Sequence, residues 1–486
     1  MSRLTKTNSY VRQLQQLIHD LQANGKLQQS VYQSAAQFFS EDTQQREILQ
    51  QHAAHLQQAQ ADLSLATAKT EATLVAKVQQ LRHKEQEAQH QYQLQQQLRY
   101  EQLLLLCQKL LRLSEGQQHE DTIYRSSRLL GTLQLMSPTD GEFLATTQQK
   151  YKPFYKAVLS LRLLDHALKV GLIQDSYVLN YAKTRHSQPD PEMCPFRLNV
   201  QIPLVMTILL QDIGLCLPHI KPLFQGSDGT LPHYREFSPD ERQHYLALNL
   251  TAAVNYLQHG LKQPTYRGHS KSERQEYQQQ YQQQLDFAIR LLHSAALPGD
   301  GIGNLLKIPQ VYASAVLPGR NRYNYQALPK VALILKNGAR QGHYHEPFVN
   351  ALLTITGIFP QGYGIVFLPK SADGANTERY EFAIVNSLYP SQPEVPICRV
   401  VTRKLQFHSV GQNCSISIEH NLYFKLARQQ LAVIEPARLR EILQKLSANT
   451  DPGQVRHLLP RYWHPDHFFA DPKHQNLWNK TILLAN

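Results

Sequence analysis

Cysteine is scarce in this chain of 486 residues, and its placement excludes a disulfide framework or a zinc ribbon. The five cysteines are scattered, odd in number and form no CxxC pair, which favours a reducing compartment. The first ten residues, MSRLTKTNSY, lack the apolar core of a signal peptide. The longest apolar run near that end, Leu103–Cys107, is far too short to span a bilayer. We therefore expect a cytoplasmic protein without membrane insertion.

The chain also lacks the short motifs of common nucleotide and hydrolase sites. It contains no Walker A loop, no G-x-G-x-x-G and no G-x-S-x-G elbow. Acidic residues are the smaller charged class, with 38 Asp and Glu against 50 Lys and Arg, a net charge of +12. This excess favours an anionic partner. It is spread along the chain without a dense Lys/Arg block, so nucleic acid is not the expected partner.

Proline is absent before Pro138, which suits long helices in the first 136 residues. Apolar residues there follow three- and four-residue spacing: Val11, Leu14, Ile18 and Leu21 in one seam, and Leu74, Val78 and Leu81 in another. With Gln-rich flanks, this spacing is typical of a coiled coil or a long antiparallel helical hairpin. Two interpretations remain open: a solvated helical bundle, or a helix pair that dimerises, relays a signal or binds a protein partner.

The rest of the chain changes character twice. A turn sequence at Ser137–Gly141 leads into a second helical region, which we place at 150–358. Residues 359–420 contain short apolar, strand-like runs separated by turn residues, which predict a small antiparallel β element. Residues 421–486 should hold a C-terminal helix at 436–446 and a tail. The expected fold class is therefore mainly α, with a helical or coiled-coil domain at 1–136.

The most informative motif is Leu209–Gly214, which reads LLQDIG. It resembles the "LLHDIG" core of metal-dependent HD phosphohydrolases, except that Gln211 replaces the histidine beside Asp212. A neutral imidazole is a good ligand for a transition metal, whereas an amide is a poor one. The motif is therefore compatible with a fold of this kind that has kept its shape and lost its metal site.

The order of motifs from about 160 to 368 resembles the HD-GYP family, helical metal-dependent phosphodiesterases that hydrolyse cyclic di-GMP. His166 matches the histidine that opens the family's domain, and Phe237–Arg242 matches its "LTPEE" helix start. The family's next metal histidine would fall near Leu248 or Asn249. The resemblance implies an HD-GYP-like helical bundle in which most metal ligands are missing.

Two further segments extend the resemblance. Gly299–Leu305 (GDGIGNL) resembles the family's "DGSGYP" loop, so Asp300, Gly301 and Gly303 belong to the implied vestigial site, with His293 just upstream. Arg320–Tyr323 (RNRY) resembles the family's "RPY" element. Basic side chains suit phosphate, so Arg320, Arg322 and Tyr323 are candidate phosphate-binding residues.

A phosphodiesterase of this kind needs two or three metals clustered by His and Asp. Only His166, Asp212 and His293 remain near matching positions, and a buried Asp212 would need a partner such as His166. We therefore expect no cofactor, no catalytic residues and a non-catalytic regulatory or scaffolding protein in bacterial cyclic di-GMP signalling. Two alternatives remain: a metal-dependent phosphohydrolase with a rebuilt ligand set, and a nucleotide receptor that binds a cyclic dinucleotide without hydrolysing it.

Overall fold

A computed structural model gives the fold of most of the chain. The residues it describes are 7–22, 29–67, 69–138, 143–185, 188, 190–226, 228–232, 234–299, 301–319, 323–369, 380–431, 460–478 and 483–485. The expected C-terminal helix at 436–446 lies outside these ranges. Among the described helices, none is both long and apolar enough to cross a membrane.

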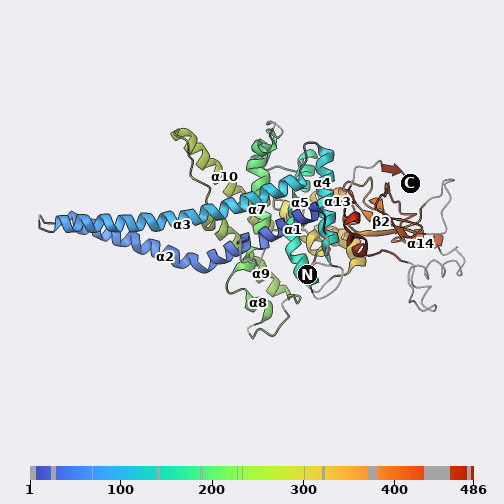
Figure 1. The fold of residues 1–486 in the computed structure, drawn as a ribbon, viewed down its shortest axis with the longest axis horizontal. Helices are drawn as coiled ribbons and strands as arrows, with labels where there is room; N and C mark the ends of the chain where they lie inside the picture. Colours follow the sequence, from blue (N-terminus) through green and yellow to red (C-terminus); the bar gives the residue numbers. More distant parts are fainter. Residues whose placement is uncertain are drawn as a thin grey trace.

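The first helices form a long hairpin that projects from one end of the molecule (Figure 1). Helix α1 (Ser9–Gln22) buries the predicted seam, and it lies at the root of the hairpin formed by α2 (Val31–Ser64) and α3 (Glu71–Ser114). A hydrogen bond of 2.8 Å from the Tyr92 hydroxyl to Asp42 marks the root. Beyond it the seam continues through the buried Leu56, Ala59 and Val78. The expected antiparallel hairpin is therefore present.

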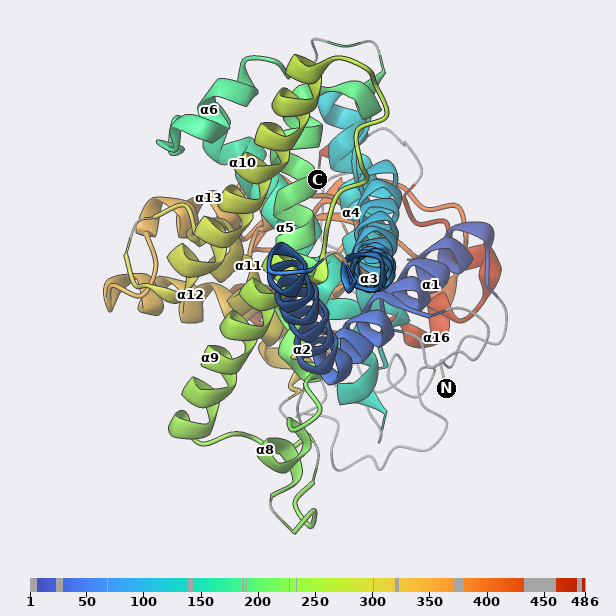
Figure 2. The ribbon, with the colours of Figure 1, turned by 90° about the vertical axis from the view of Figure 1, so that its left-hand side faces the viewer.

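The body is a bundle of helices around α5 (Leu144–Lys169), whose residues 151 to 164 are all buried. Figure 2 looks along the hairpin and shows these helices around its root. Those that pack on α5 are α1, α4 (His119–Met136), α7 (Ile202–Leu210), α11 (Asn304–Val316) and α13 (Glu346–Thr356). The outer helices are α6 (Ser176–Ala182), α8 (Lys221–Gln225), α9 (Pro239–Asn255), α10 (Lys271–Ala296) and α12 (Val331–Arg340).

The expected start of a helix at Phe237–Arg242 is confirmed. Ser238 caps α9, accepting from the Glu241 amide at 3.2 Å, while the Glu241 carboxylate accepts from the Ser238 amide at 2.8 Å. This reciprocal capping box satisfies two amides that the first turn would otherwise leave unpaired. Two π-helical turns, Arg197–Gln201 and Tyr256–Gly260, precede α7 and follow α9.

A small sheet lies at the end of the body opposite the hairpin (Figure 1). Strands β1 (Gly364–Phe367), β2 (Glu381–Val385), β3 (Ile397–Val400) and β6 (Asn413–Ser415) pair antiparallel in that order. The predicted antiparallel β element is thus confirmed. A fifth strand, β7 (Leu483–Ala485), adds to β6 in parallel. The short pair β4 (Thr402–Arg403) and β5 (Gln406–Phe407) forms a separate ribbon.

One buried apolar cluster joins the helical body and one face of the sheet. It draws on residues from Tyr10 to Trp478, so the expected segments 1–136 and 150–358 share it. Two tryptophans from the C-terminal part of the chain complete this core. The Trp463 indole donates to the Ala383 carbonyl at 3.0 Å, and Trp478 lies against Gly131. A β-carbon at Gly131 would lie 2.4 Å from the Trp478 ring, so the tail requires glycine there. All five cysteines carry free thiols.

Candidate functional site

The LLQDIG motif lies where the buried helix α7 ends. Every residue of α7, Ile202–Leu210, is buried, and its sequence IPLVMTILL contains a single hydroxyl as its only polar side chain. Gln211 ends the helix, and a 3₁₀ turn, Ile213–Cys216, follows Asp212. Asp212 is 7% exposed. The motif therefore places an amide and a carboxylate at the edge of an apolar interior, where both need hydrogen-bond partners.

The partner of both side chains is Lys156 of α5. Its ammonium donates to the Asp212 carboxylate at 2.8 Å and to the Gln211 side-chain oxygen at 3.1 Å. The Lys156 side chain is only 1% exposed. A cation supplied by the chain itself is thus bound by the two residues that the resemblance places at the HD pair.

The surroundings of Asp212 favour its charged form. Burial alone would raise the pKa of Asp212, but the charges of Lys156 and Lys152 and the hydrogen bond from Lys156 outweigh it and lower that pKa. Asp212 therefore carries a negative charge at neutral pH. An opposite charge within hydrogen-bond distance is the ordinary way for a buried carboxylate to stay ionised.

Asn249, one of the two residues near which the resemblance places a further metal histidine, also reaches this turn. Asn249 of α9 is 4% exposed, and its side-chain oxygen accepts from the Gly214 amide at 2.8 Å. A β-carbon at Gly214 would lie 2.5 Å from that oxygen, so the close approach requires glycine. The structure thus gathers Gln211, Asp212 and Asn249 around one turn, together with the ammonium of Lys156.

His166 is not the partner of Asp212, and this expectation is wrong. His166 follows Lys156 by ten residues on the same helix, about 15 Å along the axis. Its half-buried ring stacks on Tyr389, with 5.8 Å between ring centroids. Burial, with a smaller contribution from the charge of Lys169, lowers the pKa of His166. The expectation failed because Lys156 faces the Gln211–Asp212 turn and takes up its carboxylate.

The glycine loop serves as a connection between α10 and α11. The Gly303 amide donates to the Ser294 hydroxyl at 2.8 Å, and a β-carbon at Gly303 would lie 2.1 Å from the Ala295 nitrogen. The Asn304 amide group donates to the carbonyls of Gly299 and Gly301 at 2.9 and 2.8 Å. These bonds satisfy the loop's own backbone. Close packing thus explains Gly303, whereas Gly299 has a positive φ of 106° that favours glycine.

Of the remaining predicted residues, the structure describes His293 and Tyr323, and neither contacts Lys156. His293, in the last turn of α10, is exposed to solvent. Tyr323 accepts a hydrogen bond from the Gln134 amide at 3.3 Å, and its ring lies 6.3 Å from that of Tyr325. Asp300, Arg320 and Arg322 lie outside the described residues. Within the described ranges, no three His, Cys, Asp or Glu side chains are grouped closely enough to hold a metal ion.

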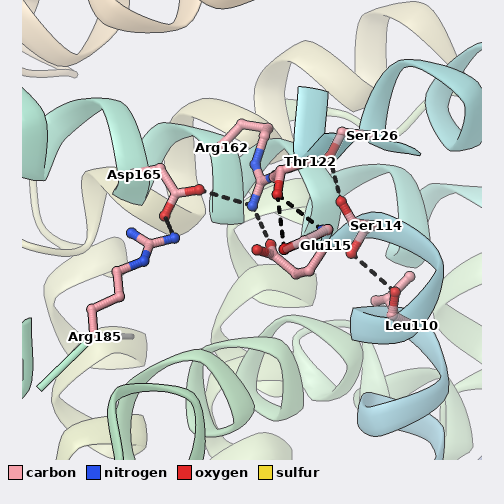
Figure 3. Close-up of polar contacts among 9 residues, drawn as sticks. Leu110, Ser114, Glu115, Thr122, Ser126, Arg162, Asp165 and Arg185 are labelled. Atoms are coloured by element: carbon pink, nitrogen blue, oxygen red, sulfur yellow. Dashed lines mark hydrogen bonds and ion pairs between the residues drawn. The ribbon is translucent and has the colours of Figure 1, made fainter. Parts of the chain in front are cut away.

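Sequence reasoning missed a second buried ion cluster (Figure 3). Arg162 of α5, 1% exposed, pairs with Glu115 at the end of α3 and with Asp165, at 2.9 Å for the latter. Asp165 also pairs with Arg185 at 2.6 Å, and Arg162 donates to the Ser126 hydroxyl of α4 at 3.1 Å. The signal was present: Lys156 and Arg162 are lone cations in the apolar run FYKAVLSLRLL. Such cations are rarely buried unless they are paired.

With this geometry in hand, the chain was compared with known proteins. No protein-family model, no curated protein and no solved structure matches it.

We predict that Asp212→Ala lowers the free energy of unfolding by about 3–5 kcal/mol, because it leaves the Lys156 ammonium buried without its carboxylate. The double variant Lys156→Met/Asp212→Leu should recover much of this loss, since it removes both charges. Urea denaturation of the parent, both single variants and the double variant gives the coupling energy. Glu192→Ala, which breaks an exposed pair with Arg112, is the control and should change stability little. Additive single effects would contradict the pairing.

We also predict a pH signature for Asp212→Asn. Because the pKa of Asp212 is lowered in the folded protein, the stability from its charge is fully present above the unfolded pKa of about 3.9 and is lost as the pH falls through the folded value. The stability difference between parent and variant should therefore be constant from about pH 5 to 7 and shrink below about pH 4. Urea melts at four pH values measure it. A difference that widens on acidification would show that Asp212 is not held as a carboxylate.

Proposed function

We propose that this chain is a non-catalytic regulatory or scaffolding protein of the bacterial cytoplasm, built on a helical body similar to a degenerate HD-GYP domain and acting in cyclic di-GMP signalling. One observation carries the proposal. The Lys156 ammonium lies between Gln211 and Asp212, the two residues at the positions where the resemblance implies metal ligands.

A fixed ammonium and a divalent metal compete for the same place. A metal bound to the carboxylate of Asp212 would meet the positive charge of Lys156, which already lies 2.8 Å from that carboxylate. Metal-dependent phosphoester hydrolysis uses the metal to make a hydroxide and to neutralise the phosphate. An ammonium supplies a charge but cannot coordinate and activate a water in this way. The arrangement therefore suits a site that stabilises the fold.

The hairpin supports a role in binding other proteins. From Tyr92 to its tip, α3 extends for about 30 Å away from the root. The face of α3 near the root exposes Leu94, Leu98 and Leu105, at 39%, 57% and 56%. Their spacing of four and seven residues places them along one side of the helix. Such a stripe is suited to pairing with a further helix, as in coiled-coil self-association.

We predict that the purified chain contains no stoichiometric iron, manganese or zinc and does not hydrolyse cyclic di-GMP. The reason is that the chain's own cation, Lys156, is bound at the HD positions. Elemental analysis and a hydrolysis assay in added Mn²⁺ test this, with an active HD-GYP enzyme assayed in parallel. About two metals per chain, together with turnover that Asp212→Asn abolishes, would establish the rebuilt phosphohydrolase instead.

We further predict that the hairpin mediates self-association. A variant in which a short Gly/Ser turn replaces residues 46–88 should keep the body folded, because only three apolar side chains, Leu56, Ala59 and Val78, form the buried cluster of this part. Its mass by light scattering should fall to that of a monomer. Leu98→Gln/Leu105→Gln leaves the hairpin length unchanged and tests the exposed stripe. A parent that is monomeric, or an excised variant that keeps the parent's oligomeric mass, would disprove this role.

A further inference from the structure

Two of the five cysteines lie directly opposite each other in the sheet. Cys398 of β3 and Cys414 of β6 are cross-strand partners in the antiparallel register. They are 0% and 4% exposed, and both belong to the apolar cluster that also contains Tyr363, so their side chains lie on the same face of the sheet. Both carry free thiols. The fold therefore brings two thiols from different strands together in one buried place.

The hydrogen bonds of this strand pair define the spacing between the two cysteines. The Val400 amide donates to the Gln412 carbonyl at 3.0 Å. Because hydrogen-bonded pairs alternate along an antiparallel ladder, Cys398 and Cys414, two residues away on each strand, form a pair of the same kind. The α-carbons of such a pair lie about 5.5 Å apart, within the range of about 4.4–6.8 Å that disulfides span. The backbone spacing thus permits a bond between the two sulfur atoms.

The spacing of the β-carbons makes this bond a strained one. The β-carbons of directly opposite residues lie about 4.5–5.5 Å apart, towards the upper end in a hydrogen-bonded pair. A disulfide brings them to about 3.8 Å, so closing the bond requires the strands to shift towards each other by about 1 Å. A disulfide under such strain is more easily reduced than an unstrained one. The pair is therefore suited to a reversible bond and not to a permanent one.

In the closed sheet both thiols are protonated. Burial raises the pKa of Cys414 to about 12, and it raises the pKa of Cys398 well above its ordinary value. The Cys398 thiol donates to the Pro396 carbonyl at 3.7 Å. Because the thiolate is the reactive form, oxidation requires a local opening that returns these groups to water. The outer neighbour of β6 is the short edge strand β7, so an opening from this edge reaches Cys414 before Cys398.

We propose that Cys398 and Cys414 are a redox-modification site, which a small disulfide such as oxidised glutathione converts into a reversible cross-strand disulfide. The Cys414 thiolate attacks one glutathione sulfur, so that a mixed disulfide forms, the glutathione S–S bond breaks and one glutathione thiolate leaves. The Cys398 thiolate then attacks the Cys414 sulfur and releases the second glutathione.

This exchange balances in atoms and electrons. The two protein thiols are oxidised, the glutathione disulfide is reduced to two glutathiones, and the thiol protons pass through the solvent to the departing thiolates. The product holds β6 against β3 and closes the connection that contains the β4–β5 ribbon. An oxidant thereby fixes one edge of the sheet, and a reductant releases it.

Incubation of the folded full chain with oxidised glutathione, followed by alkylation and peptide mapping, tests the proposal. A peptide in which Cys398 is linked to Cys414 should appear, without glutathione on either residue. Its rate of formation should rise about tenfold per pH unit between about pH 6 and 8, because the thiolate fraction rises in that proportion. Reduced glutathione in excess should then break the link without denaturant, because the bond is strained.

Single variants separate the two steps of the exchange. Cys398→Ala removes the second thiol, so glutathione should stay bound to Cys414 as a mixed disulfide. The matched control is Cys107→Ala, which removes a thiol that is also 0% exposed, on α3. It should form the link between Cys398 and Cys414 like the parent.

A parent in which both residues stay reduced, although the denatured chain reacts, would overturn the site. A link from either residue to another cysteine would overturn it too. A link that excess reduced glutathione leaves intact in the folded chain would overturn its reversible character. The site goes beyond the proposed scaffolding role, and none of these outcomes bears on the metal content or the oligomeric mass, so the proposed function is tested separately.

Discussion

The fold depends on one constraint. Helix α5 buries two cations in the core, and other elements must supply carboxylates to pair with them. Lys156 and Arg162 are each 1% exposed, and their carboxylates come from Asp212 after α7 and from Glu115 at the end of α3. A buried charge that loses its partner is costly. The ends of α3 and α7 are therefore fixed against α5, and the hairpin takes its direction from the same contacts.

The Lys156–Asp212 pair also explains how a buried carboxylate can stay ionised without a metal. A cluster of inward-facing carboxylate and amide oxygens still needs a positive charge to be stable in an apolar interior. Lys156 supplies that charge from within the chain. An ammonium does not replace a metal in coordination, because it donates hydrogen bonds but has no empty orbital for a substrate oxygen or a water.

The sequence predicted local structure well and tertiary pairing poorly. The seam from Val11 to Leu21 and the strands β1, β2 and β3 follow from periodicity, which depends only on neighbours in the chain. The partner of Asp212 does not follow, because it depends on which turn of α5 faces α7; the expected His166 is ten residues away from the turn that does. Strand β7 was not predicted either, because its pairing with β6 joins residues about seventy positions apart in the sequence.

Helix α3 has a mechanical consequence. It runs without interruption for 44 residues, about 66 Å, from the tip of the hairpin to the residue before Glu115. It therefore connects the tip of the hairpin rigidly to the buried cluster around Arg162, because Glu115 at its end pairs with that residue (Figure 3). A tilt of the hairpin at its tip would therefore be transmitted to the buried ion cluster at the other end of α3, where a displaced charge would lose its partner.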